Sequence, residues 1–176
     1  MKFKDIGLNG VFLIELEKRE DARGFFARAW CREEFAQAGL VHDIAQVNLS
    51  FNKDKGTVRG MHYQKPPYEE VKIVSCAQGA IFDVVIDVRE DSPTKFQWYG
   101  VELTAGNGKM LYVPKGFAHG YQTIQEETAV IYFVSQAYVP SSENGVHWAD
   151  PRMGVEWPIV NQVIVSDKDA AWPLVR

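Results

Sequence analysis

Short apolar runs alternate with polar turn residues along most of the chain. The runs are rich in β-branched and aromatic residues, which is typical of β-strands. They cover residues 11–14, 24–30, 44–51, 57–63, 71–76, 80–88, 97–103, 109–113, 120–124 and 130–139. Turn residues such as Gln78-Gly79 and Gly106-Asn107-Gly108 separate them. Many short strands at roughly regular spacing predict an all-β sandwich or barrel, most simply a jelly roll.

Two segments depart from this strand pattern. Residues 32–38 read as a short helix that ends at Gly39. From residue 140 onward the chain has little periodicity and is rich in Trp, Pro and Asp. We expect this irregular C-terminal tail to pack over the barrel, because Trp148, Trp157 and Trp172 would not stay in solvent. There is no internal repeat or linker, so residues 1–176 are predicted to form a single domain.

Composition excludes several classes of function. The chain has 176 residues, of which 46% are apolar and 24% charged, as in an ordinary globular protein. A net charge of −4 gives no overall attraction to nucleic acid or to an anionic membrane. No apolar run is long enough to span a bilayer, and no secretory signal is visible. Cys31 and Cys76 lack CxxC spacing, and we expect a cytoplasmic protein without nucleic-acid or membrane partners.

The histidines raise the question of a metal site. His62 lies in Arg59-Gly60-Met61-His62-Tyr63-Gln64, and His119 lies in the segment 114–120. Jelly rolls of the cupin type often bind a metal through an HxH motif, a glutamate and a later histidine. The second imidazole of HxH is missing here, so a metal would be poorly held unless Glu69 or Glu70 contributed. The metal-free interpretation is favoured, and a metal-dependent cupin enzyme is the alternative.

Without a metal, His62 is a candidate general base, and the alternative is a core histidine satisfied by backbone hydrogen bonds. Arg59 would face away from His62 in a regular strand, but Gly60 permits a bulge that brings both into one cavity. Lys72 and Tyr132 stand inside apolar runs, where a polar group is costly unless it faces a polar cavity. A histidine, a cation and a phenol on neighbouring strands predict an acid–base site.

Six sequence blocks then occur in an order and spacing that point to one family. They are residues 21–26 (DARGFF), 59–64 (RGMHYQ), 79–84 (GAIFDV), 116–120 (GFAHG), 148–151 (WADP) and 166–169 (SDKD). Together they resemble the signature blocks of the dTDP-4-dehydrorhamnose 3,5-epimerase family, over residues 5 to 173. The resemblance implies a cupin-type jelly-roll barrel with short helices, and a cofactor-independent epimerase of nucleotide-linked 4-keto-6-deoxyhexoses.

The same resemblance implies four catalytic roles. His62 matches the base that removes a proton beside the C4 ketone, and Asp169 matches the carboxylate that fixes the tautomer of this histidine. Lys72 matches the cation near the C4 oxygen, where charge develops in the enolate. Tyr132 matches the acid that returns a proton from the opposite face and so inverts the carbon.

Binding residues and an assembly are implied in the same way. The positions that match contacts to a nucleoside diphosphate sugar are Arg23, Phe26, Arg28, Gln46, Asn48, Arg59, His119, Tyr138, Glu143 and Lys168. No metal and no cofactor are implied. Members of the family form homodimers with exchanged N-terminal segments, so Arg23 and Phe26 are expected to serve the neighbouring subunit's site.

Some positions depart from the family pattern and leave the substrate open. Position 28 is Arg where many members carry glutamate near the nucleotide, so the identity of the base is in question. One catalytic set can also invert C3, C5 or both. The alternatives inside the family are therefore a sugar-ring isomerase and an epimerase of C3 or C5 only on a CDP- or GDP-linked sugar. A separate, non-enzymatic alternative is a sugar- or nucleotide-binding module that has the barrel but no turnover.

Overall fold

The structure is a computed structural model, and it describes residues 1–175. Thirteen strands form two large antiparallel sheets and one small hairpin in this part of the chain. The strands are β1 Lys2–Asp5, β2 Phe12–Glu15, β3 Arg19–Asp21, β4 Gly24–Phe26, β5 Gln46–Asn52, β6 Val58–Gln64, β7 Lys72–Gln78, β8 Ala80–Asp87, β9 Trp98–Thr104, β10 Lys109–Val113, β11 Phe117–Thr123, β12 Thr128–Val134 and β13 Glu143–Gly145. Two short α-helices, α1 Arg32–Gln37 and α2 Asp167–Ala170, and a 3₁₀ turn at Pro140–Ser142 complete the elements.

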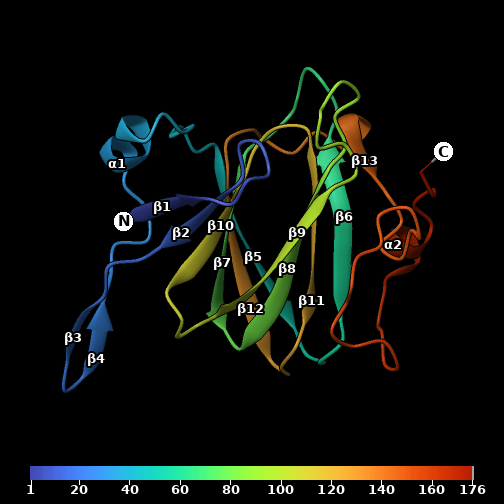
Figure 1. Ribbon diagram of the computed structural model, residues 1–176. Coiled ribbons are helices and arrows are strands. Elements are labelled where there is room, and N and C mark those ends of the chain that lie inside the picture. Colours follow the sequence, from blue (N-terminus) through green and yellow to red (C-terminus); the bar gives the residue numbers. More distant parts are fainter. Residues whose placement is uncertain (176) are drawn as a thin grey trace.

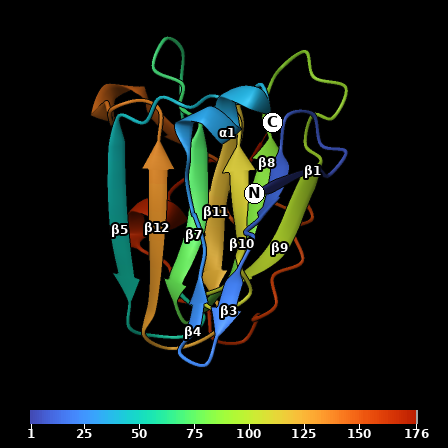
Figure 2. The same ribbon diagram turned by 90° about the vertical axis from the view of Figure 1, so that its left-hand side faces the viewer.

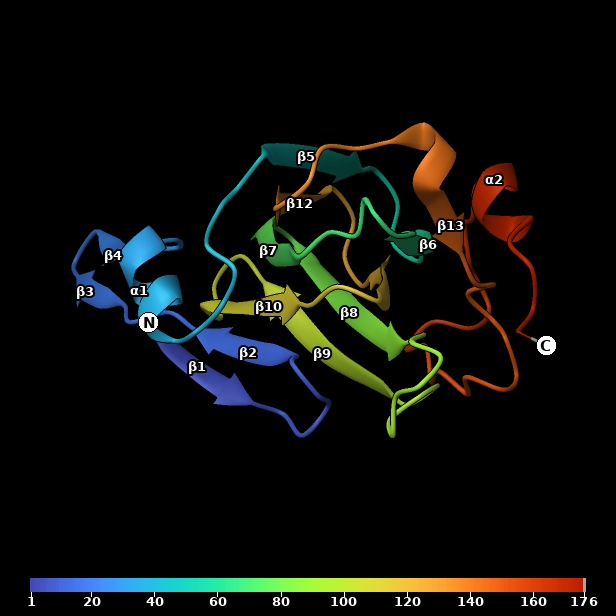
Figure 3. The same cartoon turned by 90° about the horizontal axis from the view of Figure 1, so that it is seen from above.

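The two large sheets face each other and form the barrel (Figure 1). One has the strand order β1-β2-β10-β7-β12-β5, and the other has the order β13-β6-β11-β8-β9. Figure 3, a view from above, shows the two sheets as two separate layers of strands. The all-β, cupin-type jelly-roll prediction is confirmed.

Alternation along the strands fills the space between the sheets with apolar side chains. Val74 of β7 and Val130 of β12 meet Ile81 and Val85 of β8, and none of the four is exposed to solvent. Tyr132 of β12 packs against the same cluster. One end of this interior is polar, and that end holds the candidate site.

The N-terminal hairpin and the C-terminal tail lie on opposite sides of the barrel. The hairpin of β3 and β4 projects away from the sheets, whereas β13 and α2 lie beside β6 (Figures 1 and 3). Figure 2 shows α1 in front of the face made by β7 and β10. The tail packs on the barrel as predicted, since Trp157 is 8% exposed and joins a cluster with Met61 and Val84.

Several predicted boundaries were wrong. The strand predicted at 24–30 ends at Phe26, and the strand predicted at 130–139 ends at Val134. β11 begins at Phe117, so His119 lies inside a strand. Strands β1, β3 and β13 and helix α2 were not predicted. These elements are only three or four residues long, which is too short for a periodic pattern to indicate them.

A bulge in β6 shapes the polar end of the barrel. His62 pairs with His119, but Arg59 pairs with Tyr121, so β6 carries one more residue than β11 in this interval. Gly60 lies between them with a φ of 132°, a conformation that favours glycine. A Cβ atom at position 60 would lie 2.5 Å from the Cα atom of Gly120. The predicted bulge at Gly60 is present.

None of the helices in residues 1–175 is long and apolar enough to cross a membrane.

Replacing Gly60 with Ala is predicted to destabilise the fold. The added methyl group would force a left-handed alanine against the backbone of β11, at a cost of about 2–4 kcal/mol in the free energy of unfolding. Gly106→Ala is the control, because a Cβ atom at position 106 meets nothing within 4 Å. Urea denaturation of both variants measures the effect. Equal losses in the two would contradict the role given to Gly60.

Candidate active site

A cavity of about 330 Å³ opens at the polar end of the barrel. Its walls come from both sheets and from the C-terminal tail. The lining residues are Ser50, Arg59, His62, Lys72, His119, Tyr121, Tyr132, Ser166, Lys168 and Asp169. Sequence segments more than a hundred residues apart therefore meet in one pocket.

His62 is held by a carboxylate from the tail. Its Nε2 atom lies 2.6 Å from Asp169 Oδ1, and the other oxygen of Asp169 accepts a hydrogen bond from the backbone N–H of Gly60 at 3.2 Å. Burial opposes ionisation of Asp169, but the bonds from His62 and Gly60 outweigh it, so the pKa of Asp169 is below its ordinary value of 3.8. An ionised carboxylate can only accept, so Nε2 donates and Nδ1 is left as the basic nitrogen.

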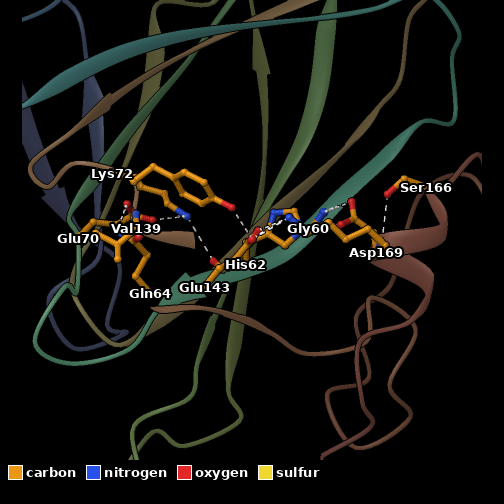
Figure 4. A network of polar contacts seen from close by, with 11 residues as sticks. Gly60, His62, Gln64, Glu70, Lys72, Val139, Glu143, Ser166 and Asp169 are labelled. Carbon is orange, nitrogen blue, oxygen red and sulfur yellow. Dashed lines mark hydrogen bonds and ion pairs between the residues drawn. The ribbon is translucent and has the colours of Figure 1, made fainter. Parts of the chain in front are cut away.

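Short-range capping places Asp169 correctly. Ser166 caps helix α2, and its hydroxyl accepts a hydrogen bond from the backbone N–H of Asp169 at 3.1 Å. Asp169 is 5% exposed, whereas Asp167 is exposed to solvent and Lys168 extends to Glu143 at the edge of the pocket. The four-residue helix thus directs one carboxylate inward. Figure 4 shows the contacts that join Ser166 to Asp169 and Asp169 to Gly60 and His62.

Lys72 lies on the other side of His62. Its Nζ atom is 3.1 Å from Glu70 Oε1 and 3.3 Å from the backbone oxygen of His62 (Figure 4). The side chains of Lys72 and Glu70 are only 13% and 11% exposed. This pairing explains how a lysine can stand at the start of an apolar strand.

His119 forms a second pair with a carboxylate. Its Nε2 atom lies 2.7 Å from Oδ1 of Asp83, whose side chain is not exposed at all. Burial raises the pKa of Asp83, and His119 acts against this rise. The ring of His119 meets Tyr132 edge-on, with a centroid separation of 6.0 Å. Burial also raises the pKa of the Tyr132 phenol well above its ordinary value.

The base and acid candidates come from facing sheets. His62 and His119 stand on β6 and β11, whereas Lys72 and Tyr132 stand on β7 and β12. The cavity between them is polar in an otherwise apolar barrel. Such an arrangement can remove a proton from one side of a bound molecule and donate one from the other side.

A second group of predicted residues lies at the rim of the pocket. Glu143 accepts hydrogen bonds from the Tyr138 hydroxyl at 2.6 Å and from Lys168 Nζ at 2.6 and 2.7 Å. Gln46 accepts a bond from the backbone N–H of Tyr138 at 2.8 Å. Burial works against ionisation of Glu143, but the hydrogen bonds from Lys168 and Tyr138 lower its pKa overall. Asn48 is exposed on β5, two residues from Gln46 and on the same strand face.

The predicted N-terminal binding residues are not in this pocket. Arg23 binds Asp21 in the β3–β4 turn, with a shortest contact of 2.6 Å, and Arg28 binds Glu34 at 2.9 Å. Phe26 is 70% exposed. Arg23 and Phe26 belong to the β3–β4 hairpin, which projects away from the barrel (Figure 1), whereas Arg28 follows β4 and binds helix α1.

Sequence reasoning missed several polar residues of the site: Ser50, Asp83, Tyr121 and Ser166. Glu70 was considered only as a possible metal ligand, and it pairs with Lys72 instead. Asp83 could have been found, because it interrupts the apolar run of β8 in the same way that Lys72 interrupts β7. The hydroxyl residues carry no comparable signal, since Ser and Tyr are common on half-buried strands.

A metal site was the alternative for the two histidines. Within residues 1–175, no group of three or more His, Cys, Asp or Glu side chains is placed to hold a metal ion. His62 and His119 each bind a carboxylate through Nε2 instead of converging on a common point. The donor set therefore does not match a three-ligand metal centre.

Comparisons with known proteins agree with this fold. The family model described as dTDP-4-dehydrorhamnose 3,5-epimerase matches residues 5–176. A curated relative of that name from Sinorhizobium fredii is 40% identical, covering 98% of this chain and 89% of its own length. A Streptomyces niveus relative named dTDP-4-dehydrorhamnose 3-epimerase is 38% identical, covering 97% of this chain and 83% of its own.

A solved structure of the same kind is also similar. It is a dTDP-4-dehydrorhamnose 3,5-epimerase from Bacillus anthracis with TDP and PPi bound. It has a TM-score of 0.95 and 38% identity, and the match covers 99% of each chain. Fold and relatives together define the chain as a carbohydrate epimerase, an isomerase-type enzyme. The chain belongs to the dTDP-4-dehydrorhamnose 3,5-epimerase family.

The His62–Asp169 pair gives a prediction about stability and pH. Because the pKa of Asp169 is lower in the folded chain, its ionised form stabilises the fold above the ordinary value of 3.8. That contribution is lost as the pH falls through the folded pKa. The loss of unfolding free energy in Asp169→Asn should therefore shrink as the pH is lowered from about 6 to about 2.5.

Denaturation at a series of pH values measures this dependence. Asp167→Asn, on the exposed side of the same helix, is the matched control and should show little loss at any pH. A loss in Asp169→Asn that did not vary with pH would contradict the ionised pair.

Proposed function

We propose that the chain epimerises a nucleotide-linked 4-keto-6-deoxyhexose, converting dTDP-4-dehydro-6-deoxy-D-glucose to dTDP-4-dehydro-L-rhamnose. The observation that carries this proposal is that His62 and Tyr132 line one pocket from facing sheets. A sugar ring between them would lose a proton to one side and gain one from the other. That exchange of faces is what inverts a carbon.

His62 is the base in this mechanism. The bond to Asp169 keeps the proton on Nε2 and leaves Nδ1 free to take the proton from the carbon beside the C4 ketone. The carbon–hydrogen electron pair moves toward the ketone, and an enolate forms. Lys72 stabilises the negative charge on the C4 oxygen, which develops mainly in the transition state and so raises the rate.

Tyr132 is the acid. Its raised pKa keeps the phenol protonated until the enolate accepts the proton. The proposed reaction steps include no redox change and use no cofactor. His119, held by Asp83 and next to Tyr132, is a substrate contact in this proposal.

The dTDP part of the proposal is supported by relatives. The Bacillus anthracis structure is described with TDP and PPi bound, and the Sinorhizobium fredii relative is named for a dTDP sugar. Arg59 is a planar, charged donor in the pocket and suits a diphosphate oxygen. The Streptomyces niveus relative is named a 3-epimerase, so the number of inverted carbons is left to experiment.

Solvent-exchange measurements test the chemistry. The wild-type protein, stripped of metals by chelation, is expected to incorporate deuterium at C3 or C5 and to form the inverted product. In His62→Ala the rates of deuterium incorporation and of product formation should both fall about 10²–10⁴-fold. In Tyr132→Phe the rate of formation of the inverted product should fall strongly. The location of the exchanged carbon by NMR also shows whether C3, C5 or both are inverted.

Matched controls are available for both substitutions. His42→Ala and Tyr68→Phe change residues outside the pocket and should keep wild-type turnover. Activity that returned only on addition of iron, manganese or zinc would favour the metal-dependent alternative. Absence of exchange with dTDP-, CDP-, GDP- and UDP-linked 4-keto sugars would refute the epimerase proposal.

We also propose that the enzyme is a homodimer in which the N-terminal hairpins serve the neighbouring subunit. Strand β5 is an edge strand, and Val47, Leu49 and Phe51 on its outer face are 58%, 69% and 50% exposed. Such an apolar row on an unpaired edge suits a second copy of the chain. Phe26, 70% exposed on the projecting hairpin, would be covered in the same assembly.

Mixed dimers test this arrangement. If Arg23 acts in the partner's pocket, each site takes His62 from one chain and Arg23 from the other. A heterodimer of Arg23→Ala and His62→Ala chains then has one site with both residues intact and one site with both residues changed. An equal, randomly associated mixture should recover about a quarter of wild-type activity. A mixture of His62→Ala and Tyr132→Phe chains is the control and should recover none, since both residues line the pocket of one chain. No recovery in verified heterodimers of the first pair would rule out the exchange.

A further inference from the structure

A chain of hydrogen bonds leads from Arg59 to the Tyr132 hydroxyl. Arg59 Nε donates to Asn52 Oδ1 at 2.7 Å, and Asn52 Nδ2 donates to the Tyr121 oxygen at 3.0 Å. The Tyr121 hydroxyl lies 2.9 Å from Ser50 Oγ, which lies 3.4 Å from the Tyr132 hydroxyl. The proposed mechanism so far gives no role to Ser50, Asn52 or Tyr121.

The orientation of the Asn52 amide is fixed at both ends. Arg59 can only donate, so the atom that faces it is the amide oxygen. The backbone carbonyl of Thr128 can only accept, so the atom 3.1 Å from it is the amide nitrogen. Asn52 is 3% exposed and has no room for another arrangement in solvent. Its NH₂ group therefore faces Tyr121.

This orientation sets the direction of the remaining bonds. Tyr121 accepts from Asn52, so its own proton has two acceptors within reach. One is Ser50 Oγ at 2.9 Å, and the other is Asn52 Oδ1 at 3.3 Å, which already accepts from Arg59. Ser50 Oγ is the better acceptor, because its distance to the Tyr121 oxygen is shorter and it does not already accept a bond from Arg59. Once Ser50 accepts this bond, its own proton is free to point to Tyr132.

We propose that Ser50 and Tyr121 are positioning residues for Tyr132, directing a hydrogen bond to its oxygen so that its own proton faces the substrate. This inference rests on the proposed function. When Tyr132 acts as acid, its O–H bond breaks, a C–H bond forms on the substrate carbon, and the electron pair stays on the phenolate oxygen. After turnover the protonated His62 releases its proton to solvent water and the phenolate takes one up from solvent water, which restores both groups. During the step, the bond from Ser50 stabilises the phenolate.

The surroundings of Tyr132 make such a donor necessary. The phenol is partly buried where the pocket meets the apolar core, and a phenolate there is costly unless donors face it. The Ser50–Tyr132 distance of 3.4 Å is long for two neutral hydroxyls. Hydrogen bonds to a charged acceptor are shorter and stronger, so the contact is expected to tighten as charge develops.

Ser50→Ala and Tyr121→Phe remove the two hydroxyls and test the proposal. With dTDP-4-dehydro-6-deoxy-D-glucose in deuterated buffer, kcat for the inverted product should fall about 10- to 100-fold, as for the loss of a hydrogen bond to a charged group. KM should change by less than about threefold. Deuterium exchange into unreacted substrate depends on His62 and should fall much less, so the ratio of exchange to inversion rises.

One rescue and two controls accompany these variants. Ser50→Thr keeps the hydroxyl and should recover most of the turnover. Ser75→Ala lies on the other face of β7 from Lys72, and Tyr112→Phe removes a hydroxyl that binds the backbone of Val41. Both are outside the pocket and should retain wild-type kcat.

The outcomes separate this inference from the proposed function. Folded Ser50→Ala and Tyr121→Phe proteins with wild-type kcat and an unchanged ratio of exchange to inversion would overturn the positioning role. A raised KM with unchanged kcat would also overturn it, because the hydroxyls would then bind substrate only. A wild-type protein that neither exchanges nor inverts overturns the proposed function itself, before any variant is made.

Discussion

The bulge of β6 at Gly60 is the constraint on which the pocket depends. One extra residue between Arg59 and His62 turns both side chains to the same side of the strand. The close approach of β6 and β11 allows no side chain at this crossing: a Cβ atom at Gly120 would lie 2.6 Å from Met61 Sδ and 2.7 Å from the Arg59 oxygen. The Gly60 N–H binds Asp169, so the same irregularity anchors the C-terminal helix to the barrel.

Hydrogen-bonded pairs of side chains keep a polar pocket stable inside an apolar barrel. His62, His119 and Lys72 each contact a carboxyl group that is itself nearly buried, namely Asp169, Asp83 and Glu70. A buried polar or charged group without a partner would cost several kcal/mol, whereas a hydrogen-bonded one is tolerated. The pairs also hold each side chain in one orientation. Orientation is what an acid–base site needs before a substrate enters.

Sequence alone predicted the barrel and the residues that are out of place within it. Lys72 and Tyr132 were visible because they stand in apolar strands, and Gly60 was visible because a glycine beside a histidine permits a bulge. Asp169 came only from the resemblance to a family, because a four-residue helix 107 residues from His62 has no pattern that links the two. The strands β1 and β13 were missed because three or four residues are too few to show a periodic pattern. Ser50 and Tyr121 meet through a contact between strands that lie far apart in the sequence, and a single sequence has no pattern that indicates such a contact.

The two-sheet architecture explains why a jelly roll suits stereochemical inversion. An inverting acid and base must reach opposite faces of a flat enolate, so they cannot stand side by side on one strand. Here β6 and β12 belong to different sheets, and the sheets are held apart by the packed core below the pocket. In the proposed mechanism, the base His62 is held from the tail by Asp169, and the acid Tyr132 contacts Ser50 of β5, which in turn contacts Tyr121 of β11. The bonds of Tyr121 with Ser50 and Asn52 cross from one sheet to the other, so they also hold the two sheets at a fixed separation beside the pocket.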